Sequence, residues 1–600
     1  MERSQINKED TWDLTKIFKN DAEYTKTYQE VLNKITKIKA MKGQILNDEN
    51  SLYAYLKTND ELSIALGKIY KYSYLYHYQD ANATEGKKYK EQAESLLTKV
   101  TQELAFTKNE LLNNDYETIK ELIKKNPKLE EYAFGLECLY RYKKCTLSEK
   151  EEQIIASFET VLGTGDDAFG NLDNADVKFA NVIKDGQNVP LNHSNYSNFM
   201  IDKDRSVRKD AFKKYYAFYE EHKNTLAALY KSQVKEDNLI AKIRSFPSSM
   251  EYSLYEDNID KEVYLNLIAA IHKNLDSLYA YLDFRRDFLG YDKLHMYDIY
   301  VELCNINSKK YTFNEAKEVI LKALEPLGKT YIEDISKMFN NRSIDKYPND
   351  GKRSGAYEWG VYGITPYVSV NFEGDYTSVS TVIHELGHAM HSYYSDNNQT
   401  YTNSSYPIFL AEIASTVNEV LLNEYMIKNA KTNEEKLFYI TKFLDEFRAT
   451  VYRQTQFAEF EYLVHEMDKE EVPLTTEKLY ETYYDLNKLY YKNVVNDEEI
   501  GYEWSRIPHF YTPFYVYKYA TGFSCAIKIA NDILNNKEGA LENYLCFLKS
   551  GGSDYPLNIL AKCGIDMRKT NVIDDAVAMF KDRLIMAKKL REEMINNGSK

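Results

Sequence analysis

The sequence predicts a mainly α-helical protein with one small β-sheet, and three observations support this fold class. Along most of the chain apolar residues recur at steps of three and four between charged residues, as in residues 21–46 and 90–112, which is the period of one face of a helix. Glycine and proline, which weaken helices, number only 23 and 11 among 600 residues. Residues 351–374 depart from this pattern and predict the sheet.

The length of 600 residues is too great for a single compact core and predicts two domains. Residues 163–199 are rich in Gly, Asn and Asp, which is typical of a hairpin or a hinge. We place the boundary within this stretch. The prediction is an N-terminal helical lobe at residues 1–190 and a second domain at residues 191–600.

The charge balance argues against some partners. With 77 basic and 92 acidic residues the net charge is −15, and an acidic surface repels the phosphates of nucleic acid. The first residues lack the apolar core of a signal peptide, and no run of about 18 apolar residues follows. We therefore expect a cytoplasmic protein that binds neither nucleic acid nor a membrane.

The predicted sheet lies in a glycine-rich stretch. Residues 351–374 hold five of the 23 glycines, and the end of the stretch alternates as a strand does. One face carries Tyr367, Ser369 and Asn371, and the other carries Val368, Val370 and Phe372. Pro366 predicts a position at the sheet edge, because proline cannot donate to a neighbouring strand.

The motif HELGH at residues 384–388 follows this strand. On a helix His384 and His388 lie one turn apart on the same face, where two imidazoles can bind one zinc ion with Glu385 beside the metal-bound water. Apolar residues at 382, 386, 389, 390 and 393 occupy the opposite face. The alternative is a helix that carries these polar residues on a solvated face.

A catalytic zinc ion needs a third protein ligand. His391 lies on the same helix but about 10 Å from His384 along its axis, so it is better suited to a place behind the ligands or in the core. Glu412 is the better candidate, because it lies on a second amphipathic helix after Pro407. On that helix Glu419 either orients a ligand imidazole or is an ordinary solvated residue.

Four segments together resemble the oligoendopeptidase F branch of the thimet oligopeptidase family of zinc metallopeptidases. They are HELGHAMH (384–391), AEIASTVNE (411–419), the glycine-rich strand before them, and PHFYTPFYVYKYATGF (508–523). The resemblance extends from residue 11 to residue 567. It implies a large helical clam-like body with a deep central channel. It also implies one zinc ion held by the residues matching His384, His388 and Glu412, with the match to Glu385 as general base, and short peptides as substrates.

The tyrosine-rich segment at residues 508–523 supplies further candidate catalytic residues. Thr512 and Pro513 predict the start of a helix, with Thr512 as its cap, on which Tyr515 and Tyr519 are one turn apart. In the family a histidine and tyrosines of this segment face the zinc ion, which implies that His509, Tyr515 and Tyr519 stabilise the oxyanion. The spacing differs from that of the animal thimet-type members, so the division of roles among the tyrosines stays open. Tyr511 and Tyr517 are predicted to contact substrate.

The sequence therefore predicts a zinc endopeptidase, monomeric or a small homo-oligomer, that hydrolyses internal bonds of short peptides. The strand is predicted to hold the peptide as an added strand, with Gly363, Tyr367 and Ser369 as substrate contacts. A zinc exopeptidase, which needs a group to bind a free terminus, is one alternative. A non-catalytic zinc-containing peptide-binding protein is the other, although such a protein would not need Glu385.

Overall fold

The computed structural model describes residues 1–304 and 309–598, which pack into two compact units of three segments each. Unit 1 contains Met1–Lys144, Asn307–Leu422 and Ile529–Gly564, and unit 2 contains Cys145–Ile306, Asn423–Lys528 and Ile565–Lys600. The division into a lobe at residues 1–190 and a catalytic domain at residues 191–600 stays a prediction.

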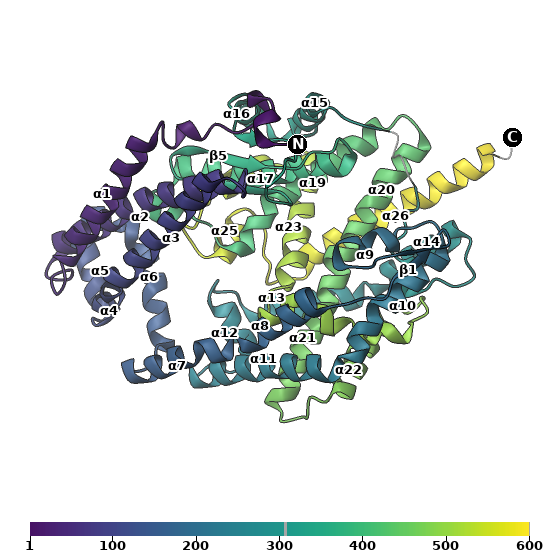
Figure 1. Ribbon diagram of the computed structural model, residues 1–600, viewed down its shortest axis with the longest axis horizontal. Coiled ribbons are helices and arrows are strands. Elements are labelled where there is room, and N and C mark those ends of the chain that lie inside the picture. Colours follow the sequence, from purple (N-terminus) through teal and green to yellow (C-terminus); the bar gives the residue numbers. More distant parts are fainter. Residues whose placement is uncertain (305–308, 599–600) are drawn as a thin grey trace. The chain divides into compact units, whose positions relative to one another are not determined.

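Unit 1 is built of helices around one small sheet, and its N-terminal helices α1, α2 and α3 pack side by side (Figure 1). Its helices are α1 (Asp21–Lys39), α2 (Glu49–Tyr78), α3 (Thr84–Leu104), α4 (Phe106–Leu112), α5 (Tyr116–Lys125), α6 (Ala133–Arg141), α15 (Phe313–Ala323), α16 (Lys329–Asn340), α17 (Tyr376–Asn398), α18 (Tyr401–Ser404), α24 (Ala540–Ser550) and α25 (Pro556–Lys562). Two more helices, α19 (Ile408–Asn429) and α23 (Tyr517–Leu534), contain boundaries between the units.

The sheet of unit 1 has three strands, β3 (Ile344–Asp345), β4 (Tyr357–Val361) and β5 (Ile364–Ser369), in the order β3-β5-β4. Strand β5 is parallel to β3 and antiparallel to β4, and α17 packs against both β4 and β5. The predicted strand and its place beside the HELGH helix are confirmed.

The predicted position of this strand at a sheet edge is wrong, because β5 is the central strand. Pro366 is accommodated because the pairing of β4 with β5 shifts register between Trp359 and Val361. At such an irregularity a residue without an N–H group breaks no regular ladder.

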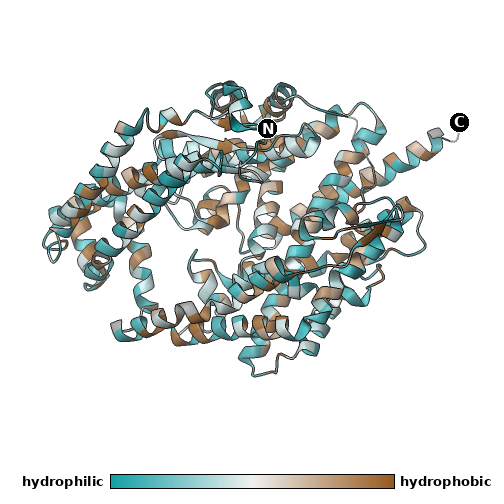
Figure 2. Ribbon diagram, in the orientation of Figure 1, coloured by the Kyte–Doolittle hydropathy of each residue, from teal (hydrophilic) through white to brown (hydrophobic). Residues whose placement is uncertain are grey.

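The helices are amphipathic, as the apolar period predicts (Figure 2). In α2 the side chains of Leu52, Leu62 and Ile69 are buried in the core of unit 1, whereas charged residues such as Glu61 lie on the other face. The carboxylate of Asp48 caps this helix by accepting the N–H of Ser51 at 2.7 Å. Among the described residues, every helix is too short or too polar to cross a lipid bilayer.

Unit 2 is also mainly helical, and its core is rich in aromatic rings such as Tyr230, Phe460 and Phe510. Its helices are α7 (Glu149–Leu162), α8 (Thr164–Asn171), α9 (His193–Met200), α10 (Arg205–Glu221), α11 (Lys223–Ile243), α12 (Ser249–Tyr255), α13 (Lys261–Lys273), α14 (Leu275–Leu289), α20 (Asn433–Phe447), α21 (Arg453–Lys469), α22 (Thr476–Tyr490) and α26 (Asn571–Gly598). Strands β1 (Val182–Lys184) and β2 (Gln187–Val189) pair as a hairpin within the glycine-rich stretch 163–199. The fold class, mainly α with small sheets, is therefore confirmed, and the central channel stays a prediction.

Candidate metal centre

Helix α17 carries the two histidines of the HELGH motif. The helix begins after Asp375, whose carboxylate accepts the N–H of Ser378 at 2.8 Å and so caps the first turn. Its apolar stripe is fully buried except for Tyr393, which is half-buried, and this burial fixes the orientation of the opposite face. On that face the rings of His384 and His388 lie with their centroids 4.9 Å apart.

Glu412 comes from the second helix, α19, and meets both histidines. Its Oε2 lies 3.5 Å from Nε2 of His384 and 3.5 Å from Nε2 of His388. One donor atom from each of these three residues lies within 4.8 Å of the other two. The structure therefore brings together two imidazoles and a carboxylate, the three predicted ligands.

The backbones of α17 and α19 approach closely beside this group. A Cβ on Gly387 would lie 2.4 Å from Cα of Ser415, so only a glycine allows the two helices this separation. Asn418 of α19 also donates its side-chain N–H to the carbonyl of Ile383 at 3.1 Å. These contacts set the distance between the helix with the histidines and the helix with the carboxylate.

Glu419 lies behind His384. Its Oε2 is 3.2 Å from Nδ1 of His384, and its Oε1 accepts the hydroxyl of Ser380 at 3.3 Å. Burial by itself lowers the pKa of His384, but Glu419 and the other carboxylates raise it to about 9. A carboxylate on Nδ1 fixes the ring orientation and leaves Nε2 directed at Glu412.

The acidic groups of the site differ in their proton affinity. Burial raises the pKa of Glu385, so this carboxyl is a stronger base than an exposed glutamate. Burial also acts to raise the pKa of Glu412, but His388, His384 and Ser415 lower it to about 2. Glu412 is therefore ionised at neutral pH, as a metal ligand must be.

His391 lies apart from this group. Its ring is fully buried and stacks on the ring of Tyr406 at a centroid distance of 3.7 Å, with Phe547 at 5.0 Å. Neither ring nitrogen has a hydrogen-bond partner among the described residues, and burial lowers the pKa of His391 to about 3. This neutral histidine packs as a core residue.

The second predicted group lies in unit 2. The rings of His509, Tyr515 and Tyr519 lie with their centroids 5.4–5.9 Å apart, and the hydroxyl of Tyr519 is 3.4 Å from Nε2 of His509. All three side chains are partly exposed. Burial, together with Arg453, lowers the pKa of His509, which favours the neutral imidazole at pH 7.

The predicted helix start at Thr512 and Pro513 is wrong, because α23 begins only at Tyr517. Between them Phe514 has a φ of +54°, a left-handed conformation that no helix contains. Tyr515 therefore lies in a loop, and the one-turn spacing from Tyr519 does not explain why their rings meet.

Several predicted substrate contacts lie in the interior. Tyr367 is fully buried and donates its hydroxyl to the carbonyl of Asp13 at 2.8 Å, Ser369 is also buried, and Tyr517 is buried against Tyr264. These predictions are corrected, because the three side chains are buried and so are not presented to a ligand. Strand β5 is also paired on both sides, which leaves its backbone no free edge for an added peptide strand.

The other two predicted contacts lie in a turn and against aromatic rings. Gly363 lies in the turn between β4 and β5 with a φ of +76°. The ring of Tyr511 stacks on Phe169 at 4.6 Å and remains partly exposed.

Sequence reasoning missed two polar residues beside the candidate centre. One is Asn418, which joins the two helices as described above. The other is Glu358 of β4, whose pKa is raised to about 7 by burial, against the lowering effect of His388 and Lys71. A charged residue inside a short strand was the available signal.

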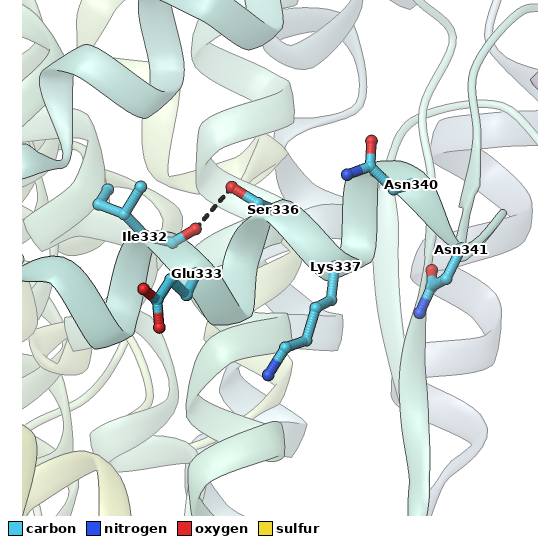
Figure 3. A pocket seen from close by; sticks show the side chains of 6 residues that line it. All are labelled: Ile332, Glu333, Ser336, Lys337, Asn340 and Asn341. Carbon is cyan, nitrogen blue, oxygen red and sulfur yellow. Dashed lines mark hydrogen bonds between the residues drawn. The ribbon is translucent and has the colours of Figure 1, made fainter.

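A pocket on α16 does not belong to this site (Figure 3). It is lined by Ile332, Glu333, Ser336, Lys337, Asn340 and Asn341. Ser336 donates its hydroxyl to the carbonyl of Ile332 at 2.6 Å, and Lys337 pairs with Asp334 at 2.7 Å. The pocket is an open depression along one exposed helix face.

The fold and the site thus define a mainly helical protein in which two histidines and a carboxylate from a second helix could hold one metal ion, with a glutamate next to the first histidine. Comparison with known proteins agrees. The family model described as peptidase family M3 matches residues 198–579, and one described as oligopeptidase F matches residues 110–179. The chain therefore belongs to peptidase family M3.

Relatives match nearly the whole chain. Oligopeptidase PepF of Bacillus subtilis is 38% identical over 97% of this chain and 87% of its own length. Group B oligopeptidase PepB of Streptococcus agalactiae is 36% identical over 99% of both chains. The crystal structure of oligoendopeptidase-F from Enterococcus faecium has a TM-score of 0.73 at 34% identity, covering 96% of this chain and 99% of that one. The predicted resemblance to oligoendopeptidase F is confirmed.

Proposed function

We propose that this chain is a zinc endopeptidase that hydrolyses internal bonds of short peptides. The single observation that carries the proposal is the meeting of His384, His388 and Glu412 within 4.8 Å, with Glu385 next to the first ligand on the same helix. Membership of peptidase family M3 and the oligopeptidase relatives support the substrate class.

The donor set fits zinc. Two imidazole nitrogens and one carboxylate oxygen leave one position of a tetrahedral ion open, as in catalytic zinc sites. Two ligand atoms bound to one such ion at 2.0–2.2 Å are about 3.4 Å apart, close to the 3.5 Å from Glu412 to each histidine. When bound, zinc supplies Lewis acidity that activates water and polarises the scissile carbonyl.

Glu385 is the proposed general base. It accepts a proton from the attacking water and then donates it to the amine that leaves when the peptide C–N bond breaks. Its raised pKa, caused by burial, suits a group that must both accept and return a proton near neutral pH. Glu419 acts by holding Nδ1 of His384.

His509 and the partly exposed tyrosines are the proposed oxyanion donors. A neutral His509 whose ring carries one N–H can donate a hydrogen bond to the developing negative charge, as can the hydroxyl of Tyr515 or Tyr519. Loss of one such donor typically lowers kcat by about 10²–10³-fold. We place the substrate peptide as an added strand beside β4 and not beside β5, because the outer edge of β4 pairs with no strand among the described residues.

The test is Glu385→Gln in the zinc-loaded full chain, assayed with a quenched fluorescent peptide blocked at both ends. The variant is expected to keep one zinc ion per chain and lose about 10²–10⁴-fold in kcat, because an amide cannot accept the proton. Glu333→Gln is the matched control and should match the parent, because Glu333 is an exposed residue of another helix, α16, whose carboxylate pairs with Lys329.

If Glu385→Gln retains turnover, the assignment of Glu385 as general base is refuted. Zinc binding by the parent without any turnover would support the non-catalytic peptide-binding protein. Cleavage only of peptides with a free terminus would support a zinc exopeptidase.

A further inference from the structure

The loop before Tyr515 contains a backbone conformation that its own sequence does not favour. Phe514 has a φ of +54°, in the left-handed region that residues with bulky side chains rarely adopt. Its side chain is also 1% exposed. Such a conformation persists only where the surrounding structure holds it, so the groups that contact Phe514 determine the shape of this loop.

Glu461 of α21 holds the backbone of Phe514. Its Oε1 accepts the N–H of Phe514 at 2.7 Å, although the two residues are 53 positions apart in the chain. The Glu461 side chain is fully buried, and its Oε2 has no hydrogen-bond partner among the described residues. Burial of a carboxyl group that makes a single hydrogen bond costs free energy. Here that single hydrogen bond is the one from the strained residue Phe514.

The side chain of Phe514 is held from the same helix. His465, one turn after Glu461, packs its ring on that of Phe514 at 4.8 Å. This ring is itself fixed, because Nδ1 lies 2.8 Å from the carbonyl of Glu461 and Nε2 lies 3.0 Å from Oδ2 of Asp237. On the other side Ser253 donates its hydroxyl to the carbonyl of Pro513 at 2.7 Å. The residues before Tyr515 are therefore held from both α21 and α12.

Tyr515 follows Phe514 directly, so the φ and ψ of Phe514 set the direction in which Tyr515 leaves the backbone. In the structure the ring of Tyr515 lies parallel to that of His509, with an interplanar angle of 6° and centroids 5.9 Å apart. Relaxation of Phe514 to a negative φ would redirect Tyr515 and separate the two rings.

We propose that Glu461 is a positioning residue for the peptidase reaction. Through the N–H of Phe514 it holds Tyr515 beside His509, so that both donors meet the same oxyanion. This inference rests on the proposed function, in which Tyr515 acts on the substrate.

Glutamine is the natural control at position 461. Burial raises the pKa of Glu461 to about 8, against the lowering effect of His465 and of the bond from Phe514. The carboxyl group is therefore mostly protonated at pH 7, and an amide has nearly the same shape with an oxygen that accepts the same N–H. Leucine has a similar volume and no acceptor.

The experiment compares kcat and KM for the zinc-loaded full chain and four variants: Glu461→Gln, Glu461→Leu, Tyr515→Phe, and Glu461→Leu combined with Tyr515→Phe. Glu461→Leu is expected to lower kcat by about 10²-fold with little change in KM, because misplacement of a reacting group by about 1 Å has that effect. Glu461→Gln should stay within about threefold of the parent, a rescue that depends on the acceptor oxygen alone.

The double variant separates positioning from general destabilisation. If Glu461 acts through Tyr515, adding Glu461→Leu to Tyr515→Phe should lower kcat no further. Full additivity of the two losses, or a loss in Glu461→Gln as large as that in Glu461→Leu, would overturn the proposal.

Two more measurements keep the outcome decisive. If Glu461→Leu does not fold, Glu461→Asp withdraws the oxygen by one methylene while keeping a polar group. It is expected to show the same loss of kcat without additivity, and parental kcat in this variant would overturn the proposal. Parental kcat in Tyr515→Phe would instead refute the role of Tyr515 in the proposed function.

Discussion

Gly387, at the fourth position of HELGH, offers a sharp test of how the two ligand-bearing helices are held together. In the structure a Cβ at this position would lie 2.4 Å from Cα of Ser415 and 2.8 Å from the carbonyl oxygen of Ala414. Both are backbone atoms of α19 and cannot rotate away. Gly387→Ala therefore forces the helices apart.

The size of the movement follows from the contact distance. Ordinary contacts of a Cβ begin at about 3.4 Å, so the backbones must separate by about 1 Å. Glu412 lies one turn from Ser415 and moves with it, whereas zinc–ligand distances tolerate only about ±0.2 Å. We expect zinc affinity to fall by about 10²-fold. Overpacking should also lower the free energy of unfolding of the metal-free chain by about 1–3 kcal/mol.

The assay is competition for zinc against a chromophoric chelator, together with thermal unfolding of the metal-free chain. The matched control is Gly67→Ala in α2, where a Cβ would meet no atom within 4 Å. That control should keep parental zinc affinity, and its free energy of unfolding should rise by up to about 1 kcal/mol, because alanine favours the helix. Parental zinc affinity in Gly387→Ala, or an equal loss in the control, would refute the reasoning.

Two further predictions concern single side chains. Glu412→Ala is expected to lower zinc affinity by at least about 10²-fold in the same competition assay, whereas His391→Ala, which removes a core ring, should keep parental zinc affinity. The reverse ranking would refute Glu412 as the third zinc ligand. Glu461→Gln is expected to gain stability over the parent as the pH rises. The parental carboxyl has a pKa of about 8 when folded and an ordinary value of 4.5. Its contribution to stability is therefore complete below pH 4.5 and is lost as the pH rises to about 8, by about 1.4 kcal/mol per unit. Denaturant unfolding should show that the free energy of unfolding of Glu461→Gln, relative to that of the parent, increases by up to about 3 kcal/mol between about pH 5.5 and pH 7.5. If this difference stays constant, the carboxyl group of Glu461 is charged in the folded chain.

Local pattern sufficed for the helices that carry the three candidate ligands. The four-residue spacing of His384 and His388 places both rings on one helix face whatever surrounds the helix. The apolar stripe opposite them predicts which face is buried. The helix with Glu412 was visible for the same reason, because Pro407 and a periodic apolar run mark its beginning and its buried side.

Local pattern failed where a distant segment outweighed it. Pro366 predicted an edge strand, but the two-residue strand β3 pairs with β5 and is too short to be recognised in the sequence. Thr512 and Pro513 predicted a helix, but the bond from Phe514 to Glu461 stabilises a different backbone. The burial of Tyr517 was likewise not predicted, since it depends on rings from other elements, such as that of Tyr264.

The sequence by itself determined the helical class, the family and the identity of the three candidate ligands, because each follows from spacing along a single helix or from a motif. Their convergence on one point depends on the packing of α17 against α19. Only the tertiary structure decided the separation of α17 and α19 at Gly387, the central place of β5 and the left-handed Phe514. These features depend on contacts between residues far apart in the chain, and their energies outweigh the preferences of the local segment.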